Sequence, residues 1–436
     1  MQQYKKEWFG NIKGDILAGI VVCLALFPEV IGFMIVAGVP PVVGVYATFF
    51  ITAIAAFFGS SKGMISAAAG SVALVLAHLV SEYGIQYLFA ATILAGVLQV
   101  VLGFLKIGTL MRYIPKPVMI GFVNGLGIMM FTSQLDHFQG SLLLPLLGLL
   151  GIAIIFLFPR VTKKIPAPIV AILVITAIVL GFGLDVKTLG DMGSISTDLP
   201  RFGIPAVPMT LETLRIIFPT ALSVAIVGLV ESLLTAQLVD EITEEKSDKN
   251  QETLSQGLGN VVSGFFGGIA GCGMIGQTII NLNYGGLGRL ATFLSGFFML
   301  LSVVLLNGSV VQIPVVALAA VMVVVSIETI NWDSIKRLRT NPKNESFAMI
   351  LTVAIVIGTH NLAYGVVAGT LVSAVFAAFK MSHLHVAAGT ADDDHHYKVD
   401  GHLYFASAEK FLDFFAEEIE HEEEVVIDIS AMTLWD

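Results

Sequence analysis

Long apolar stretches separated by short polar segments form the main pattern of the chain, from residue 16 to residue 378. Most of them reach the roughly 17 to 25 residues with which a helix crosses the hydrocarbon core of a bilayer. The candidate spans begin near Ile16, Pro41, Met64, Gly84, Pro115, Leu142, Pro166, Glu212, Leu254, Gly273, Arg289, Pro314, Asn344 and Leu362. The pattern predicts an all-α membrane protein with 14 transmembrane segments, because a membrane barrel would show short segments of alternating polarity instead.

The composition agrees with a membrane location. Of the 436 residues, 56% are hydrophobic and 13% are charged, whereas a soluble domain carries about 25% charged residues. The 23 basic and 33 acidic residues leave a net charge of -10, which argues against a nucleic-acid partner. Cys23 and Cys272 match no metal-binding spacing. The sequence indicates no cofactor and no nucleophile, base and orienting residue of an enzyme.

The basic residues of the loops set the orientation of the predicted spans. If the amino terminus is cytoplasmic, nearly all loop Lys and Arg residues face the cytoplasm, while Lys187 and Arg201 lie outside and Arg215 lies near the outer start of the eighth span. Positive residues concentrate on the cytoplasmic side of membrane proteins. We therefore expect a multi-pass protein of a bacterial-type inner or plasma membrane, with both termini in the cytoplasm.

Two of the predicted spans, the third and the tenth, are short and rich in glycine. Residues 63–80 and 267–282 each begin with small residues that tolerate extended backbone and continue with helix-forming residues. Such half-helices exist at membrane depth only where protein buries them or they line a cavity. Their matching places predict two seven-span repeats, about 14–185 and about 210–380. An odd number of spans inverts the second repeat relative to the first, as in many secondary transporters.

Two glutamates lie deep within predicted spans at matching places of the repeats. Glu29 follows Pro28 in the first span, and Glu231 lies in the eighth. An acid at the centre of a span costs about 2.5 to 3.5 kcal/mol on insertion scales and marks a functional site by default. A protonated acid that hydrogen-bonds nearby backbone and serves packing alone fits the same pattern. Thr235 shares a helix face with Glu231, where their oxygens suit Na⁺ or H⁺, although a lone threonine more often bonds its own helix.

The two half-helices supply the opposite charge. The amino terminus of a helix presents unpaired N–H groups and about half a positive charge, so two of them aimed at one place form an anion site. Ser71 near the first start, with Gln277 and Thr278 near the second, would add hydrogen-bond donors. The same glycines also suit close helix packing in a membrane. A small anion is the substrate that the first interpretation favours.

Four segments of the chain resemble the SulP family of inorganic anion transporters, the relatives of solute carrier family 26. They are FPEVIGFMIVAGVPPVVGVYATFF at 27–50, GSVALV at 70–75, IPKPVMIGFVNGLG at 114–127 and QGLGNVVSGFFGGIAGCGMIGQTIIN at 256–281. The resemblance covers nearly the whole length. It implies a core domain of spans one to four and eight to eleven that moves against a gate domain of spans five to seven and twelve to fourteen, and it suggests a homodimer.

The resemblance also implies where substrate and coupling ion bind. The anion site between spans three and ten would include Glu29, Ala69, Gly70, Ser71, Gly273, Gln277 and Thr278. The segment ESLLT at 231–235 resembles the Asp-x-x-x-Thr pattern of the sodium-dependent bicarbonate carriers. This implies a coupling-cation site formed by Glu231, Thr235, Gly273, Met274 and Ile275.

Three positions depart from the pattern of the family. Many members have arginine where this chain has Gln277, so a coupling cation becomes more important for holding an anion. The acid Glu231 replaces the aspartate of the sodium carriers, and Glu29 stands where many members have glutamine. A glutamate in a dry pocket holds its proton tightly, which suits a proton carrier. Both Na⁺ and H⁺ therefore remain open as the coupling ion.

The chain changes character after the last span. We expect a transmembrane domain over 1–385, a linker over 386–395, and over 396–436 a sequence that resembles the start of a STAS domain, a cytoplasmic α/β module. Strands are predicted around Gly401 and at 424–430, with an amphipathic helix at 407–421 between them. About 40 residues are too few to bury both faces of a sheet, so we expect this domain to be truncated.

The sequence thus predicts a secondary active transporter of a small inorganic oxyanion, bicarbonate or sulfate, coupled to Na⁺ or H⁺ by alternating access. Its partners would be the lipid bilayer, the anion and the coupling ion, without a resident metal or cofactor. A proton-coupled carrier of a uracil-like nucleobase is the nearest alternative on this architecture. A passive anion channel and a sensor that binds an anion without transporting it are further alternatives.

Overall fold

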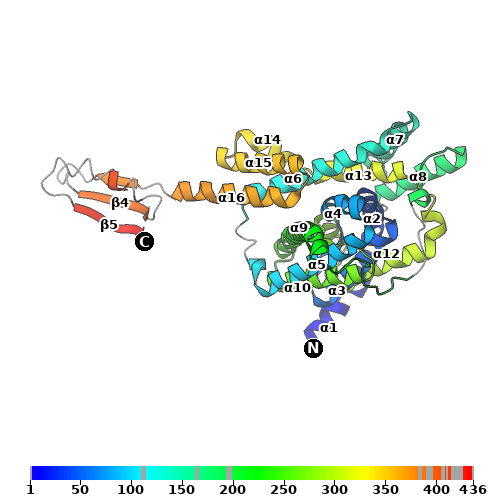
Figure 1. Cartoon of the computed structure of the whole chain (residues 1–436), viewed down its shortest axis with the longest axis horizontal. Helices are drawn as coiled ribbons and strands as arrows, with labels where there is room; N and C mark the ends of the chain where they lie inside the picture. Colours follow the sequence, from blue (N-terminus) through cyan, green and yellow to red (C-terminus); the bar gives the residue numbers. More distant parts are fainter. Residues whose placement is uncertain are drawn as a thin grey trace.

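The computed structural model describes residues 2–109, 114–162, 166–192, 199–381, 385–388, 396–403, 408, 411–413 and 426–434, which are mostly helical (Figure 1). The first half contains α1 (Gln2–Phe9), α2 (Ile12–Ala37), α3 (Pro41–Phe58), β1 (Ser66–Ala68), α4 (Gly70–Tyr83), α5 (Ile85–Phe104), α6 (Lys116–Gln134), α7 (Leu143–Leu157) and α8 (Ala167–Phe182). The second half contains α9 (Leu211–Thr243), α10 (Lys249–Phe265), β2 (Gly271–Gly273), α11 (Ile275–Asn283), α12 (Arg289–Val310), α13 (Val315–Thr329), α14 (Trp332–Lys336), α15 (Lys343–Thr359) and α16 (Leu362–Met381).

Each of the fourteen predicted start positions lies at or near the beginning of one of these helices, or of a strand that leads into a helix. Within the described residues, 7 helices are long and apolar enough to cross a membrane, and α13 with α14, bent by 47°, makes an eighth. The helices α4 and α8 and the segment Arg289–Leu305 of α12 are apolar but shorter. The fold therefore contains several candidate membrane spans.

The helix contacts repeat between the two halves. In element order α3 corresponds to α10, α4 to α11 and α5 to α12. The contact of α5 with α10 has its counterpart in the contact of α12 with α3, and the contact of α4 with α9 has its counterpart in that of α11 with α2. The same correspondence between the two halves relates the contact of α6 with α15 to the contact of α13 with α7. Both halves thus share one architecture, as a repeat requires.

The helices form two groups, which we call the core group (α2 to α5 and α9 to α12) and the gate group (α6 to α8 and α13 to α16). Most of the helix contacts lie within a group, and α2 with α13 and α9 with α16 are contacts between them. Figure 1 shows α6, α7, α13 and α16 above the bundle that contains α2, α4, α5, α9 and α10. Their members correspond to the spans expected in a core and in a gate domain, and the domain division itself stays a prediction.

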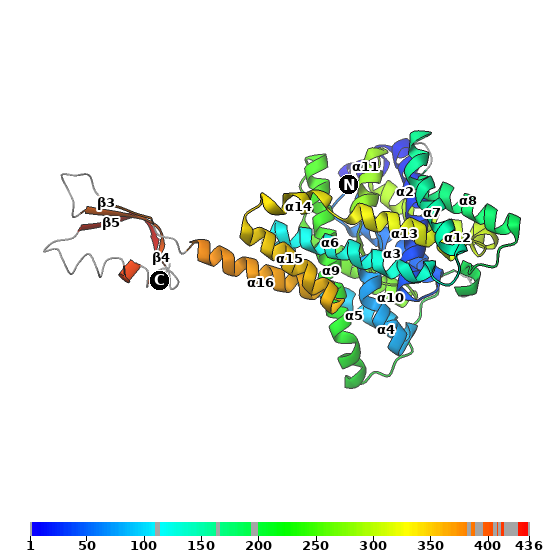
Figure 2. The same cartoon turned by 90° about the horizontal axis from the view of Figure 1, so that it is seen from above.

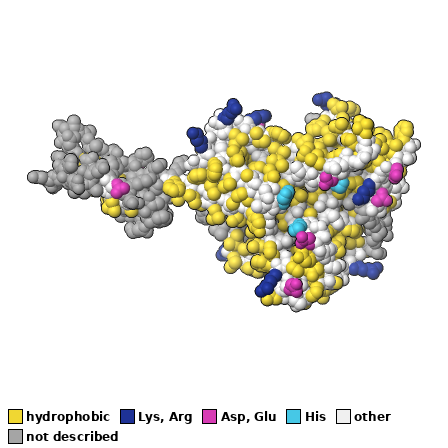
Figure 3. All heavy atoms as spheres, turned by 45° about the horizontal axis from the view of Figure 1, so that its top comes forward, with side chains coloured by type: hydrophobic (Ala, Val, Ile, Leu, Met, Phe, Trp, Pro, Cys, Tyr) yellow, Lys and Arg dark blue, Asp and Glu magenta, His cyan; other side chains and the backbone are white. Residues whose placement is uncertain are grey.

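The surface of the helical part is largely apolar. Hydrophobic side chains cover much of the face seen in Figure 3, and Lys and Arg side chains lie mainly near its upper and lower edges. Exposed Leu, Phe and Val side chains occur along α7, α8 and α16. A contiguous apolar exterior suits contact with lipid chains, because no water is available there to solvate polar groups.

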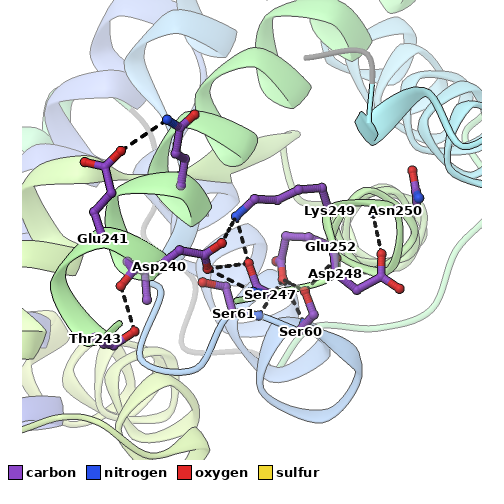
Figure 4. Close-up of polar contacts among 12 residues, drawn as sticks. Ser60, Ser61, Asp240, Glu241, Thr243, Ser247, Asp248, Lys249, Asn250 and Glu252 are labelled. Carbon is purple, nitrogen blue, oxygen red and sulfur yellow. Dashed lines mark hydrogen bonds and ion pairs between the residues drawn. The ribbon is translucent and has the colours of Figure 1, made fainter. Parts of the chain in front are cut away.

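Polar side chains fix the loop before β1 to the start of α10 (Figure 4). Glu252 Oε2 accepts hydrogen bonds from the backbone N–H groups of Ser60 at 2.8 Å and Ser61 at 2.9 Å. Next to it, Lys249 Nζ lies 2.7 Å from Asp240 Oδ2 at the end of α9. Because this loop leads into β1, the cluster helps to set the position of the first half-helix against α9 and α10.

Three strands lie beyond α16, away from the helical bundle in both views (Figures 1 and 2). β3 (His385–Ala388) pairs antiparallel with β4 (His396–Leu403), which pairs parallel with β5 (Val426–Leu434). β4 and β5 lie where strands were expected. β3 differs from the expected linker at 386–395, because backbone pairing with β4 extends the sheet into it. The helix expected at 407–421 lies outside the described residues, apart from the helical residues 408 and 411–413.

Candidate functional site

The two half-helices meet through their extended segments, which form a buried two-stranded ribbon. β1 pairs antiparallel with β2, with Ser66 opposite Gly273, Ala67 opposite Cys272 and Ala68 opposite Gly271. Opposite strand directions are what two repeats of opposite orientation require. The small residues allow the close approach, since a Cβ atom on Gly271 would lie 2.0 Å from the carbonyl oxygen of Ala67.

The half-helices begin directly after these strands, and both starts lie in one cavity of about 390 Å³. Neither α4, after Ala69, nor α11, after Met274, has a side-chain cap at its amino terminus. The first N–H groups of a helix have no partner within the helix. The two starts therefore offer unpaired donors and the positive ends of two helix dipoles to the same space.

The cavity lies between the core and gate groups. Its lining from the core group consists of Glu29, Phe33, Ala69, Gly70, Ser71, Glu231, Leu234, Gly273, Met274, Ile275, Gly276, Gln277 and Ile279. Its lining from the gate group consists of Phe122, Val123, Leu126, Met130, Val325, Glu328 and Thr329. Most of the residues that the sequence pattern placed in the anion and cation sites are therefore brought together, and Thr235 and Thr278 are not part of this lining.

Glu231 is half-buried and directed toward the first half-helix rather than toward lipid. Its Oε2 atom accepts a hydrogen bond from Ser71 Oγ at 2.6 Å and one from Cys272 Sγ. Ser71 was expected to donate to the anion, and here its hydroxyl group is engaged by the acid. The carboxylate of the second repeat thus contacts both half-helices.

Glu29 is also half-buried, and its Oε2 atom accepts a hydrogen bond from Gln277 Nε2 at 2.5 Å. Pro28 lies within the continuous helix α2, where a proline leaves one backbone carbonyl without its helical partner. The hydrogen bond between Gln277 and Glu29 joins α11 to α2, although Gln277 was expected to donate to the anion. The second amide hydrogen of Gln277 remains for another acceptor.

Thr235 is fully buried next to the ribbon and is not part of the cavity lining. Its Oγ1 atom donates to the backbone oxygen of Glu231 at 2.8 Å and lies 3.2 Å from the backbone oxygen of Gly273. A hydroxyl and two carbonyl oxygens are thus gathered near the acid, together with the backbone of Met274 and Ile275 at the start of α11. Hard oxygen ligands of this kind suit Na⁺.

Thr278 holds the ribbon in place rather than facing the cavity. It is fully buried, and its Oγ1 atom accepts a hydrogen bond from the backbone N–H of Ile65 at 3.0 Å. The N–H group of Met274 donates in turn to the backbone oxygen of Ile65 at 2.8 Å. These two bonds extend the pairing of β1 with β2 by one residue toward the start of α11.

Glu328, on α13 of the gate group, is a third carboxylate in the cavity, and the sequence pattern did not identify it. It lies near the polar end of α13, close in sequence to Asn331 and Asp333. A charged residue at the end of a membrane helix is common, so its position did not mark it as functional. Among the described residues that line the cavity there is no Lys, Arg or His. Three carboxylates and two helix starts therefore share a space without a fixed side-chain cation.

Comparison with known proteins fixes the family. The model of the sulfate permease family matches residues 12–142 and 141–352. The chain belongs to the sulfate permease family. It is 51% identical to the putative sulfate transporter YbaR of Bacillus subtilis (strain 168), over 99% of this chain and 91% of that protein.

Two solved structures have the same fold. The transmembrane domain of a cyanobacterium bicarbonate transporter, BicA, matches with a TM-score of 0.73 at 25% identity, over 84% of this chain and 98% of that one. The murine Solute Carrier 26 family member A9 anion transporter matches with a TM-score of 0.85 at 18% identity, over 100% of this chain and 83% of that one. The chain is thus a multi-pass membrane anion transporter of the sulfate permease family.

Proposed function

We propose that this protein is a secondary active transporter that carries bicarbonate or sulfate across the membrane together with Na⁺ or H⁺. The observation that carries the proposal is the cavity itself, where two uncapped helix starts face three carboxylates and the described lining contains no basic side chain. Like charges repel strongly in a poorly solvated space. An anion therefore binds well only after a proton or a cation has reduced the negative charge, which is the physical basis of symport.

The coupling ion would act at Glu231. For Na⁺, the carboxylate of Glu231, the hydroxyl of Thr235 and the carbonyl of Gly273 supply oxygen ligands within one short stretch of α9 and β2. For H⁺, protonation of Glu231 or Glu29 removes a charge from the same cavity. In both cases the anion would occupy the space at Gly70 and Gly276, where the starts of the two half-helices lie.

Transport would follow from movement of the core group against the gate group, which exposes the cavity alternately to the two sides. In this proposal all fourteen predicted segments span the membrane, both termini are cytoplasmic, and residues 1–385 form the transmembrane domain. The strands β4 and β5 would belong to the start of a STAS domain at 396–436, joined by the segment 386–395, in which β3 adds a strand to the same sheet. The assembly would be a homodimer.

Uptake by proteoliposomes tests this proposal. The purified protein should accumulate labelled sulfate or bicarbonate when a Na⁺ gradient or a pH gradient is imposed separately, and should do so against the anion gradient. Anion current without a coupling gradient would instead show a channel. Competition by uracil would show a nucleobase carrier, and binding without flux would show a sensor.

A further inference from the structure

We propose that Glu328 exchanges protons between the solution and Glu29 across the boundary of the gate and core groups. This inference rests on the proposed function and assigns a specific task to a residue of the gate. The two carboxylates line the same cavity, one from α13 and one from α2, and these two helices pack against each other.

The exposure of the two side chains sets the direction of the relay. Glu328 is exposed, whereas Glu29 is half-buried and held by Gln277. Both carboxylates line the same cavity. A proton from water therefore reaches Glu328 first, and the deeper acid can receive it from there. In this step the O–H bond of the Glu328 carboxylic acid breaks and an O–H bond on the Glu29 carboxylate forms.

The other deep acid is engaged differently. Glu231 Oε2 already accepts two hydrogen bonds, from Ser71 and Cys272. The two deep acids thus have different neighbours, since Glu231 lies close to the oxygen atoms of Thr235 and Gly273, while Glu29 shares the cavity with an acid of the gate group.

Other charged groups near α13 are directed elsewhere. The principal packing partners of α13 are α2, α6, α7, α8 and the turn Leu135–Phe138, and α2 packs mainly on α3, α4, α11 and α12. Their charged or titratable side chains other than Glu29 are Lys13, Asp15, Cys23, Tyr46, His78, Glu82, Tyr83, Lys116, Asp136, His137 and Arg289. None of these lines the cavity that Glu29 and Glu328 share.

The relay depends on the conformation of the protein, because its two acids belong to different helix groups. Glu29 moves with the core group and Glu328 stays with the gate group, so a movement of one against the other changes their separation. The relay would load or unload Glu29 in the arrangement seen here and be interrupted in another. A proton gradient would then drive net transport without a short circuit.

The test compares Glu328→Gln, Glu328→Asp and the control Glu345→Gln in the chain of 436 residues. Glu345 is an exposed acid of the gate group that lines a different cavity, with Lys116 and Arg337. Each variant is reconstituted, and net sulfate uptake driven by a pH gradient is compared with sulfate exchange at equal pH. The pH dependence of sulfate binding, with bicarbonate as a second probe, is measured on the purified proteins.

For Glu328→Gln we expect the ratio of net uptake to exchange to fall by at least about tenfold, since a positioned acid or base contributes a factor of that order or more. Glu328→Asp should restore most of the ratio, and the control should behave like wild type. Loss of the neighbouring charge should also move the pH midpoint of anion binding down by about 0.5 to 1 unit.

A wild-type ratio and midpoint in Glu328→Gln would overturn the proposal. An equal fall of net uptake and exchange that aspartate does not rescue would overturn it too, by showing a structural role. Failure of the proposed function looks different, because wild type itself would then take up neither anion under any gradient. In that case the pH midpoint of anion binding, compared between wild type and Glu328→Gln, still tests the role of Glu328.

Discussion

Ser71 Oγ, at the start of the first half-helix, donates a hydrogen bond to Glu231 Oε2 on α9 over 2.6 Å. The expected anion donor and the expected cation ligand are therefore one hydrogen-bonded pair. An anion that takes the hydroxyl of Ser71 competes with Glu231, and a cation that occupies Glu231 releases the hydroxyl. In the proposed symport each ion would thus favour the other through the same bond, and such a coupling is reciprocal by thermodynamic necessity.

Replacing Ser71 by alanine should weaken this coupling. A hydrogen bond to a charged group contributes about 1.5 to 3 kcal/mol, so we expect the apparent affinities for anion and coupling ion to fall together by about tenfold or more. Uptake measured over a range of both concentrations gives the two apparent KM values. The matched control is Ser81→Ala, because Ser81 lies on the exposed end of the same helix and donates only to the backbone oxygen of His78.

Two results would contradict this account of Ser71. A change in the apparent KM of the anion alone would show that the hydroxyl serves the anion without reference to Glu231. Equal losses in Ser71→Ala and Ser81→Ala would show that the whole helix had been disturbed.

Thr278→Val should destabilise the fold without removing a group from the cavity. Valine has a similar shape but cannot accept the hydrogen bond from the N–H of Ile65, and a buried donor without a partner costs about 1 to 3 kcal/mol. Thermal unfolding in detergent should show a lower midpoint for Thr278→Val, while Thr278→Ser stays close to wild type. Unchanged stability in the valine variant, together with a raised KM for the anion, would instead make Thr278 a substrate ligand.

Two acids of this site and the starts of both half-helices could be predicted from the sequence. Glu29 and Glu231 stood out because a charge within a long apolar run is costly. The glycine-rich starts of both half-helices stood out because they interrupt the helical pattern. Their meeting followed from the repeat, since equivalent segments of inverted halves cross near the symmetry axis.

The role of Glu328 in the cavity and the orientation of Thr278 could not be predicted from the sequence. Glu328 lies about 300 positions from Glu29 and at the polar end of its helix, so neither spacing nor local cost marks it. Whether Thr278 faces the cavity or the ribbon depends on the rotation of a helix of only nine residues. Such contacts are set by tertiary packing, which a local pattern does not contain.

Glu7→Gln should make the stability less sensitive to acid. Glu7 lies beside Arg289 Nε at 2.8 Å and Lys62 Nζ at 3.4 Å. Burial acts to raise the pKa of Glu7, but the hydrogen bond and charge of Arg289, with those of Lys62, outweigh it and hold the pKa below its usual 4.5. A carboxyl group of this kind stabilises the fold above its unfolded pKa and loses that contribution as the pH falls through its folded pKa.

The variant should therefore be less stable than wild type at pH 7, by about 0.5 to 1 kcal/mol for a pair near the surface. The difference should disappear as the pH falls below 4.5. Unfolding midpoints in detergent at neutral and acidic pH measure it, with Glu345→Gln as the control. A difference that persists in acid would mean that the ion pairs with Arg289 and Lys62 contribute nothing.

The most direct test of symport is the gradient dependence of Glu231→Gln. Anion uptake into proteoliposomes is measured with a Na⁺ gradient, with a pH gradient and with neither, beside wild type and the exposed control Glu241→Gln. We predict that the variant folds and binds the anion, but that its uptake loses the response to the Na⁺ gradient and keeps only a response to the pH gradient that acts through Glu29. Uptake by Glu231→Gln at the wild-type rate and with the wild-type gradient dependence would contradict the account.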